Sequence, residues 1–245
     1  MLALIKIEAK RMSRDKLTFI MSIGMPIFFY FVFTSLIPVP KEYQEVYYRE
    51  YLMSMTAFSL CNFSLFTFPF DIIQDRKNGW RLRLAHVDLN PWSIYAVKML
   101  KMLFMYIVAI IGVFLVGGVI KGVTLTSKEW LVSGVALLLG GFLFLGIGLV
   151  MTLFKNEKTA SVCANILYLG MSSLGGLWIP TDQFPAWLQP ISKAMPTYHV
   201  RELAVGYMNT GGIPLKSVML LCTYSFLGIL LTVTTTKKRK LDILY

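Results

Sequence analysis

The side chains that most often carry out chemistry are few in this 245-residue chain, and they are widely separated. His86 and His199 stand alone, and no H-E-x-x-H or G-x-S-x-G run is present to build a zinc site or an activated serine. Cys61, Cys163 and Cys222 show neither the spacing of metal ligands nor the even number of a disulfide framework. These residue types and spacings favour a chain without a catalytic centre of its own.

Nucleotide chemistry is also missing from the sequence. No G-x-x-x-x-G-K-S/T run is present, which is the pattern whose backbone N–H groups cradle the phosphates of a nucleotide. We therefore expect no cofactor on this chain, and any ATPase that works with it must be another polypeptide.

The elements that position these residues are six apolar stretches, each close to the ~20 residues with which an α-helix crosses about 30 Å of hydrocarbon. Composition agrees, because 56% of the residues are hydrophobic, only 15% are charged and the mean hydropathy is +0.63. We expect one all-α membrane domain, residues 1–245, with no separate soluble domain. The predicted spans are 17–37, 51–70, 102–120, 130–154, 159–179 and 217–236.

The basic residues follow the predicted membrane. Seventeen of the 24 Lys and Arg residues lie before the first span, between spans two and three, between spans four and five, or after span six, and seven lie in the other gaps. The positive-inside bias then places both termini in the cytoplasm, which agrees with six crossings. The net charge of +11 is thus explained by a multi-pass protein of a cell membrane, expected to be a bacterial plasma membrane, and not by nucleic-acid binding.

Residues 1–16 combine apolar and basic residues at helical spacing. Leu2, Ile5 and Ala9 recur against Lys6 and Lys10, which predicts an amphipathic helix lying in the cytoplasmic interface. A solvated charged terminus is the alternative. The first span exceeds the length of a signal-peptide core and no A-x-A-like cleavage site follows it, so we interpret it as a retained anchor.

The predicted spans contain almost no ionisable residues, with Asp71 at the end of span two as the exception. Proton- and sodium-coupled transporters need such groups near the bilayer midplane, and voltage sensors need rows of Arg. No TVGYG filter is present either. If the protein moves a substrate uphill, its energy enters from outside its own helices. Spans one and two are instead rich in aromatic residues, which either line a route for an amphipathic substrate or contact lipid and neighbouring helices.

The gap between spans two and three, residues 71–98, contains Asp75, Gly79 and, further on, Pro91. This order resembles the E-(K/R)-E-x-G-T-L-x-x-L-x-x-x-P pattern of ABC-2-type permeases, the membrane subunits of one class of ABC exporters. Trp80 and Arg81 stand where that pattern has Thr and Leu. A solvated basic loop is the alternative. In the family this segment docks on the ATPase, so the resemblance implies that the coupling residues are Asp75, Arg76, Gly79, Trp80, Leu82 and Leu84.

The segment before the last span, residues 180–213, is similar to a second region of the same family, in which two short helices dip back into the outer leaflet. Three prolines, Pro185, Pro190 and Pro196, punctuate it, and Gly211 and Gly212 end it, which favours short helices. The residues that carry this similarity and suit the outer interface are Trp178, Pro180, Pro185 and Trp187.

The resemblance covers the whole chain and implies a non-catalytic permease subunit. Two copies of an ABC ATPase, which bind ATP and Mg²⁺, would drive it, and a second permease copy or a homologous permease would complete it within membrane lipid. The implied activity is outward movement of an amphipathic compound, such as a drug, an antimicrobial peptide or a lipid, with antibiotic resistance as a consequence. In the mechanism that the resemblance implies, a groove between spans one, two and five carries the substrate. Phe63, Phe66 and Asn165 are predicted to face this groove.

Two other functions stay open from the sequence. A non-transporting sensor or immunity protein could bind an antimicrobial peptide through the same outer segment. A lipid-modifying enzyme would need polar or metal-binding groups converging at one interface, and the sequence shows a scatter of such residues.

Overall fold

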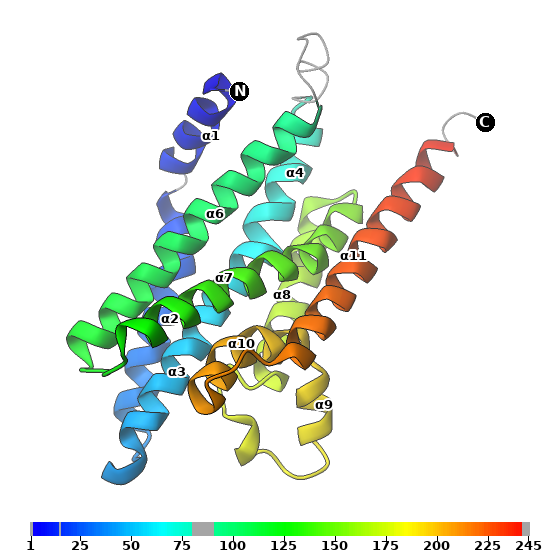
Figure 1. The fold of residues 1–245 in the computed structure, drawn as a ribbon. Coiled ribbons are helices and arrows are strands. Elements are labelled where there is room, and N and C mark those ends of the chain that lie inside the picture. The colour runs from blue at the N-terminus through cyan, green and yellow to red at the C-terminus, as the bar shows by residue number, and fades with distance from the viewer. Residues whose placement is uncertain (1, 15, 80–90, 242–245) are drawn as a thin grey trace.

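The computed structural model describes residues 2–14, 16–79 and 91–241, and the regular elements within these ranges are all helices. The first part of the chain forms α1 (Leu2–Arg14), α2 (Lys16–Leu36), α3 (Lys41–Asn62), the π-helix η1 (Phe63–Thr67) and α4 (Phe68–Lys77). The second part forms α6 (Pro91–Leu115), η2 (Val116–Ile120), α7 (Ser127–Leu149), η3 (Val150–Leu153), α8 (Glu157–Leu174), η4 (Thr181–Gln183), α9 (Gln189–Ala194), α10 (Pro196–Thr210) and α11 (Leu215–Leu241). Figure 1 shows them as a bundle of long helices with α9 and α10 at one end.

Five helical stretches in the described part of the chain are long and apolar enough to cross a membrane: Phe19–Leu36, Lys41–Lys77, Ile94–Ile120, Ser127–Leu153 and Leu215–Lys238. They coincide with five of the six predicted spans, which confirms an all-α protein with multiple membrane-spanning helices. The segment predicted as span five forms α8, an 18-residue helix that begins with Glu157 and Lys158 and is not among the five.

The helix at the centre of the bundle runs without a break from α3 through η1 into α4. Every residue from Tyr51 to Cys61 is buried. Within η1 the turn is wider, and the N–H of Phe68 donates to the carbonyl of Phe63, five residues back. Pro69 follows directly, has no N–H to donate and would crowd a regular turn. The widened turn lets the helix continue past this proline.

Helices α3 and α6 begin earlier in the chain than the predicted spans two and three. α3 begins at Lys41, after Pro40, and α6 begins at Pro91. Proline suits the start of a helix because its fixed φ is helical and the first N–H groups have no partner in the helix. Of the predicted coupling loop, residues 71–98, the structure thus places 71–77 in α4 and 91–98 in α6, and it describes Asn78 and Gly79 after α4.

Small residues let the helices cross closely. A Cβ added to Gly148 on α7 would overlap the carbonyl oxygen of Ser64 in η1. In the same way, a Cβ on Gly228 of α11 would overlap the carbonyl oxygen of Gly146. The helices can therefore come this close at the two crossings only because glycine has no side chain.

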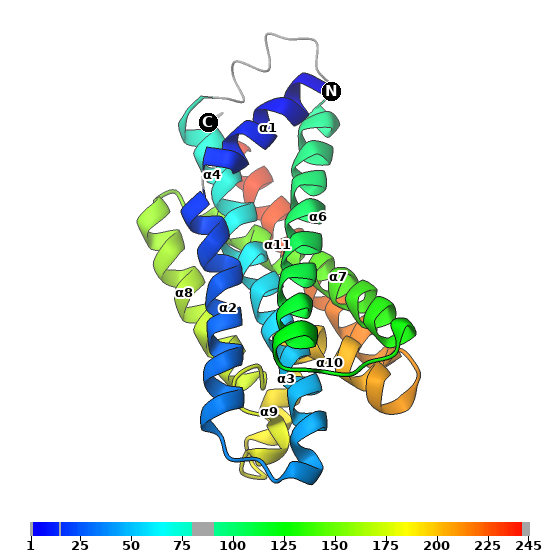
Figure 2. The same ribbon diagram turned by 90° about the vertical axis from the view of Figure 1, so that its left-hand side faces the viewer.

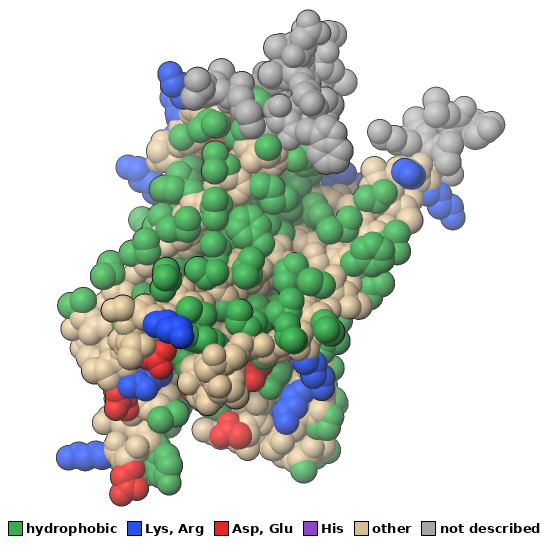
Figure 3. Space-filling model, viewed as in Figure 1, with side chains coloured by type: hydrophobic (Ala, Val, Ile, Leu, Met, Phe, Trp, Pro, Cys, Tyr) green, Lys and Arg blue, Asp and Glu red, His purple; other side chains and the backbone are tan. Residues whose placement is uncertain are grey.

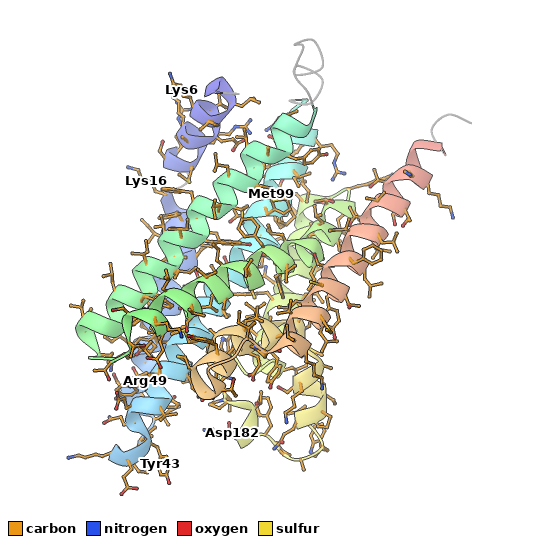
Figure 4. All side chains as sticks on the ribbon, in the orientation of Figure 1. Lys6, Lys16, Tyr43, Arg49, Met99 and Asp182 are labelled. Atoms are coloured by element: carbon orange, nitrogen blue, oxygen red, sulfur yellow. The ribbon has the colours of Figure 1, made fainter. Side chains whose placement is uncertain are left out.

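Helix α1 and the C-terminal part of α11 lie at the same end of the bundle, and α9 and α10 lie at the opposite end (Figure 1). Figure 2 shows α1 crossing that shared end between α4 and α6. Lys6 and Lys16 mark this end in Figure 4, whereas Tyr43, Arg49 and Asp182 mark the other. On the face drawn in Figure 3, an apolar band separates the charged side chains of the two ends. Such a band fits a multi-pass membrane protein.

Candidate functional site

A groove of about 490 Å³ lies between α2, the central helix and α8. Aliphatic and aromatic side chains form most of its wall, and Ser22, Asn62 and Asn165 add polar groups. Phe66 and Asn165, both predicted to face such a groove, line it. The structure thus brings two residues, which are distant in sequence, to one apolar cavity with a few polar contacts, an arrangement typical of small-molecule sites.

Phe63, the third residue predicted for this groove, does not line it. Its side chain is 0% exposed and packs against the rings of Phe19 and Tyr106, with centroid separations of 6.4 Å in both cases. In a regular α-helix, residues three apart share a face, so Phe63 and Phe66 would point the same way. The π-helical turn between them advances less per residue, and the two rings face different sides.

Aromatic rings close one part of the groove. Trp178, which follows α8, lines it together with Phe29 and Phe58, and its ring centroid lies 6.1 Å from that of Phe29 and 5.9 Å from that of Phe58. Tyr168 on α8 stacks on Phe58 at 4.6 Å and donates a hydrogen bond of 3.0 Å to the Phe58 carbonyl. This ring cluster holds α8 against α3.

Hydrogen bonds between α2 and α3 fix the opposite wall. The Ser22 hydroxyl donates to Oδ1 of Asn62 at 2.8 Å, and the Ser59 hydroxyl donates to the Ser22 carbonyl at 2.7 Å. Sequence reasoning missed Ser22 and Asn62. An Asn inside an apolar span was the signal that pointed to them, because polar side chains at this depth mark binding sites or helix contacts.

A second cavity of about 1220 Å³ lies at the end of the bundle that carries α1, between α4 and the start of α8; we call it the terminal cavity. Phe66 lines both this cavity and the groove, so the two share a wall. The terminal cavity is lined by Phe66, Thr67, Phe70, Asp71, Ile73, Gln74, Arg76, Lys77, Lys155, Asn156, Glu157, Lys158 and Ser161.

Six charged residues form a compact ion cluster at the same end. The Asp75 carboxylate on α4 accepts a hydrogen bond of 2.8 Å from Arg11 on α1 and lies 2.6 Å from Nζ of Lys98 on α6. Lys101 on α6 pairs with Asp71 on α4. Glu8 on α1 lies 3.3 Å from Arg11 and 3.7 Å from each lysine. Three carboxylates and three cations thus join α1, α4 and α6.

The residues predicted to couple to an ATPase have different surroundings, and the structure describes only some of them. Asp75 is buried in the ion cluster, where its partners belong to this chain. Arg76 donates to the carbonyl of Thr152 at 2.9 Å and to that of Phe154 at 3.2 Å, which ties α4 to the end of η3. Gly79 ends the helix in the left-handed region, with φ of 64°. Trp80, Leu82 and Leu84 lie outside the described residues.

The segment predicted to lie on the outer side, residues 180–213, contains η4, α9 and α10. Pro180 precedes η4, Pro185 accepts a 2.8 Å hydrogen bond from the N–H of Leu188 at the turn before α9, and Trp187 is 71% exposed. α10 is held more firmly, because Arg201 donates to Glu50 at 2.7 Å and to Ser54 at 2.8 Å on α3. Of the four residues predicted to matter here, Trp178 alone lines the groove.

Comparison with known proteins decides the family. Residues 1–209 match the ABC-2 type transporter family. The chain belongs to this family. It is also 30% identical over 233 residues, 95% of each chain, to a protein of Bacillus subtilis (strain 168) that is provisionally named transport permease YvfS.

Membership of the ABC-2 family makes the chain a multi-pass permease, a non-catalytic transport component whose family implies an ABC ATPase partner. Within the part of the chain that the structure describes, no group of three or more His, Cys, Asp and Glu side chains is placed to bind a metal. His199 contacts the Ser217 hydroxyl at 3.0 Å, and His86 lies outside the described residues.

Five residues of the ion cluster were not singled out for the site by sequence reasoning: Glu8, Arg11, Asp71, Lys98 and Lys101. Glu8 is an acid in an otherwise basic helix, and Lys98 and Lys101 are three residues apart, on one helical face. Both patterns were visible in the sequence, but their partners on another helix were not.

Proposed function

We propose that this chain is the permease subunit of an ATP-driven exporter that moves an amphipathic compound, a drug, an antimicrobial peptide or a lipid, from the cytoplasm or inner leaflet outward. The observation that carries the proposal is the groove lined by Phe66 and Asn165 between α2, the central helix and α8. Its apolar wall suits an apolar moiety, and its few amide and hydroxyl groups suit a polar one. ATP and Mg²⁺ bind to the partner ATPase, not to this chain.

We infer six crossings with both termini in the cytoplasm. α8 supplies the crossing that the other five lack, because 18 residues of α-helix extend about 27 Å, close to the hydrocarbon thickness. α1 and the end of α11 lie at one end of the bundle, as an even number of crossings requires. α9 and α10 then form the outer re-entrant segment.

The ion cluster supports a route for mechanical coupling. It connects α4 and α6, the helices on either side of residues 78–90, and it attaches α1 to both. A push by an ATPase on residues 78–90 would move α1, α4 and α6 together. In this proposal Asp75 transmits the motion inside the permease, while Gly79 and the residues that follow it meet the ATPase.

A second copy of the chain, or a homologous permease, would complete the transport path. The groove is bordered by exposed apolar side chains on α2, including Met21 and Met25, and on α8, including Leu169. Pairing through these helices would cover the borders and enclose the groove between two copies.

The first test is purification of the chain from its native host. An ABC ATPase that co-purifies supports the proposal. Binding of an antimicrobial peptide in the absence of any ATPase partner would instead favour a sensor or immunity protein.

The second test uses two glycines that are matched in conformation. Gly79 and Gly122 have φ of 64° and 66°, and a Cβ added to either meets no atom within 4 Å. Gly79→Glu should reduce the co-purified ATPase about tenfold, because it puts a charge into the proposed interface. Gly122→Glu carries the same backbone strain elsewhere and should leave the ATPase bound. Equal losses in the two variants would refute docking at Gly79.

A further inference from the structure

The terminal cavity and the groove form a pair of adjoining compartments of different character. The groove wall is apolar and the terminal cavity is lined largely by charged and polar side chains. Phe66 belongs to both walls, so a ligand that passes this ring touches both compartments. An amphiphile has the same division into a polar head and an apolar tail.

The charges of the terminal cavity are predominantly positive. Arg76, Lys77, Lys155 and Lys158 contribute four cations against the carboxylates of Asp71 and Glu157. Both carboxylates already have a lysine partner, since Asp71 pairs with Lys101 and Glu157 lies 3.6 Å from Lys77.

Neither Lys155 nor Lys158 has such a partner in the part of the chain that the structure describes. Both are exposed, and no carboxylate among the described residues lies within ion-pair distance of either. Their two positive charges remain available to an anion in the terminal cavity.

Thr67 adds a buried hydrogen-bonding group to this wall. Its side chain is 8% exposed, and its hydroxyl has no hydrogen-bond partner among the described residues. The hydroxyls of Ser54, Thr56 and Ser64 on the same helix all donate to the carbonyl four residues back. The hydroxyl of Thr67, at the end of the π-helix, makes no such bond and can serve a ligand, which fits the frequent placement of π-helical turns at functional sites.

We propose that this permease selects anionic amphiphiles: one phosphate or carboxylate group binds at Lys155, Lys158 and Thr67 in the terminal cavity, and an apolar chain passes Phe66 into the groove. The proposal rests on the proposed function, in which the groove is the substrate path. Lysines at the cytoplasmic ends of spans also set topology. Topology alone, however, requires neither a cavity beside them nor an unpartnered hydroxyl in its wall.

The test compares two probes with one dansyl-labelled dodecyl chain, an alkyl phosphate and the zwitterionic alkyl phosphocholine. Each is titrated by fluorescence against the purified full-length permease in a neutral detergent at low salt, where charge pairs are least screened. The alkyl phosphate should bind about tenfold more tightly than the phosphocholine. Equal affinities would overturn the proposal while leaving the groove as a path for uncharged amphiphiles.

Three variants test which residues bind the anionic head group and which contact the apolar chain. Lys155→Gln/Lys158→Gln should weaken the alkyl phosphate about tenfold and leave the phosphocholine within about twofold. Thr67→Val should weaken the same probe about threefold, because it removes the hydroxyl and keeps the shape. Phe66→Ala should weaken both probes. The matched control Lys193→Gln/Lys216→Gln removes two exposed lysines near the opposite end and should change neither affinity.

The remaining outcomes distinguish the proposal from binding of a free anion and from binding of the ATPase by the same lysines. Inorganic phosphate that displaces the alkyl phosphate at equal concentration would show a free-anion site and overturn selection of an amphiphile. If Lys155→Gln/Lys158→Gln lowers ATPase co-purification without changing probe affinity, the two lysines bind the ATPase and the proposal is wrong. If both probes bind but Phe66→Ala leaves both affinities unchanged, the groove itself fails as the substrate path, and the proposed function fails with it.

Discussion

The Asp75 carboxylate on α4 lies 2.6 Å from the Lys98 ammonium on α6, and both residues are only 4% exposed. Burying two charges is costly, and their attraction offsets this cost when the pair has further polar contacts. Arg11 supplies such a contact to Asp75 from α1. The pair therefore holds together the two helices that border residues 78–90 and the helix that lies across the end of the bundle.

Lys98→Met should destabilise the protein by about 3–5 kcal/mol, because it leaves the Asp75 carboxylate buried with less compensation. The thermal midpoint of the purified permease in detergent measures the loss. Lys77→Gln is the control, since Lys77 is exposed and its pair with Glu157 contributes about 1 kcal/mol or less. The prediction fails if the double variant Asp75→Asn/Lys98→Met is no more stable than Lys98→Met alone, because the two residues would then not be coupled.

Gly148→Ala should prevent tight packing of α7 against η1, because the added methyl group overlaps the Ser64 carbonyl. We expect a loss of monodisperse protein in size-exclusion chromatography. Gly170→Ala on α8 is the matched control, since its Cβ meets no atom within 4 Å. Alanine is favoured over glycine inside a helix by about 0.5–1 kcal/mol, so this variant should be neutral or slightly stabilised. Similar behaviour of the two variants would contradict the close crossing.

Phe63→Ala should mainly lower stability and Phe66→Ala should mainly weaken ligand binding, although the two residues are only three apart in sequence. Phe63 is fully buried outside the groove, so its loss should cost about 3–5 kcal/mol of stability and leave the ligand affinity of the surviving folded protein unchanged. Phe66 lines the groove, so its loss should weaken ligand binding and cost about 1 kcal/mol of stability. Thermal midpoints and probe titrations on both variants test this. A ligand defect confined to Phe63→Ala would show that the groove is assigned to the wrong face.

His199 should make the stability of the protein depend on pH. Burial lowers the pKa of its imidazole below the ordinary 6.5; a hydrogen bond with the Lys193 backbone opposes this shift, and the nearby Lys216 acts in the same direction as burial. The unfolded chain then binds the proton more readily, so stability is complete above pH 6.5 and falls as the pH decreases toward the folded-state pKa. His199→Gln should remove this part of the pH dependence. The same slope in the variant and the parent between pH 5 and 7 would assign the dependence to other groups.

Sequence alone determined the class of the protein, its helical spans and its family resemblance. A run of about 20 apolar residues has few alternatives to a membrane helix, because only a helix satisfies its backbone polar groups in hydrocarbon. The first predicted span, 17–37, accordingly differs by one residue at each end from α2, Lys16–Leu36. Proline spacing also predicted short helices between residues 180 and 213, where η4, α9 and α10 lie, because prolines act on the local backbone.

The tertiary structure decided which face of a helix packs in the core and which face lines a cavity. Phe63 and Phe66 look equivalent in sequence, and the π-helical turn before Pro69 separates them into a core residue and a groove residue. Asp75 looks like an exposed loop residue, and its ion pairs with Arg11 and Lys98 bury it. Composition and periodicity report that a helix is apolar or amphipathic, whereas its contacts depend on residues distant in the chain. Those long-range contacts alone bring Phe66, Asn165, Lys155 and Lys158 to adjoining cavities.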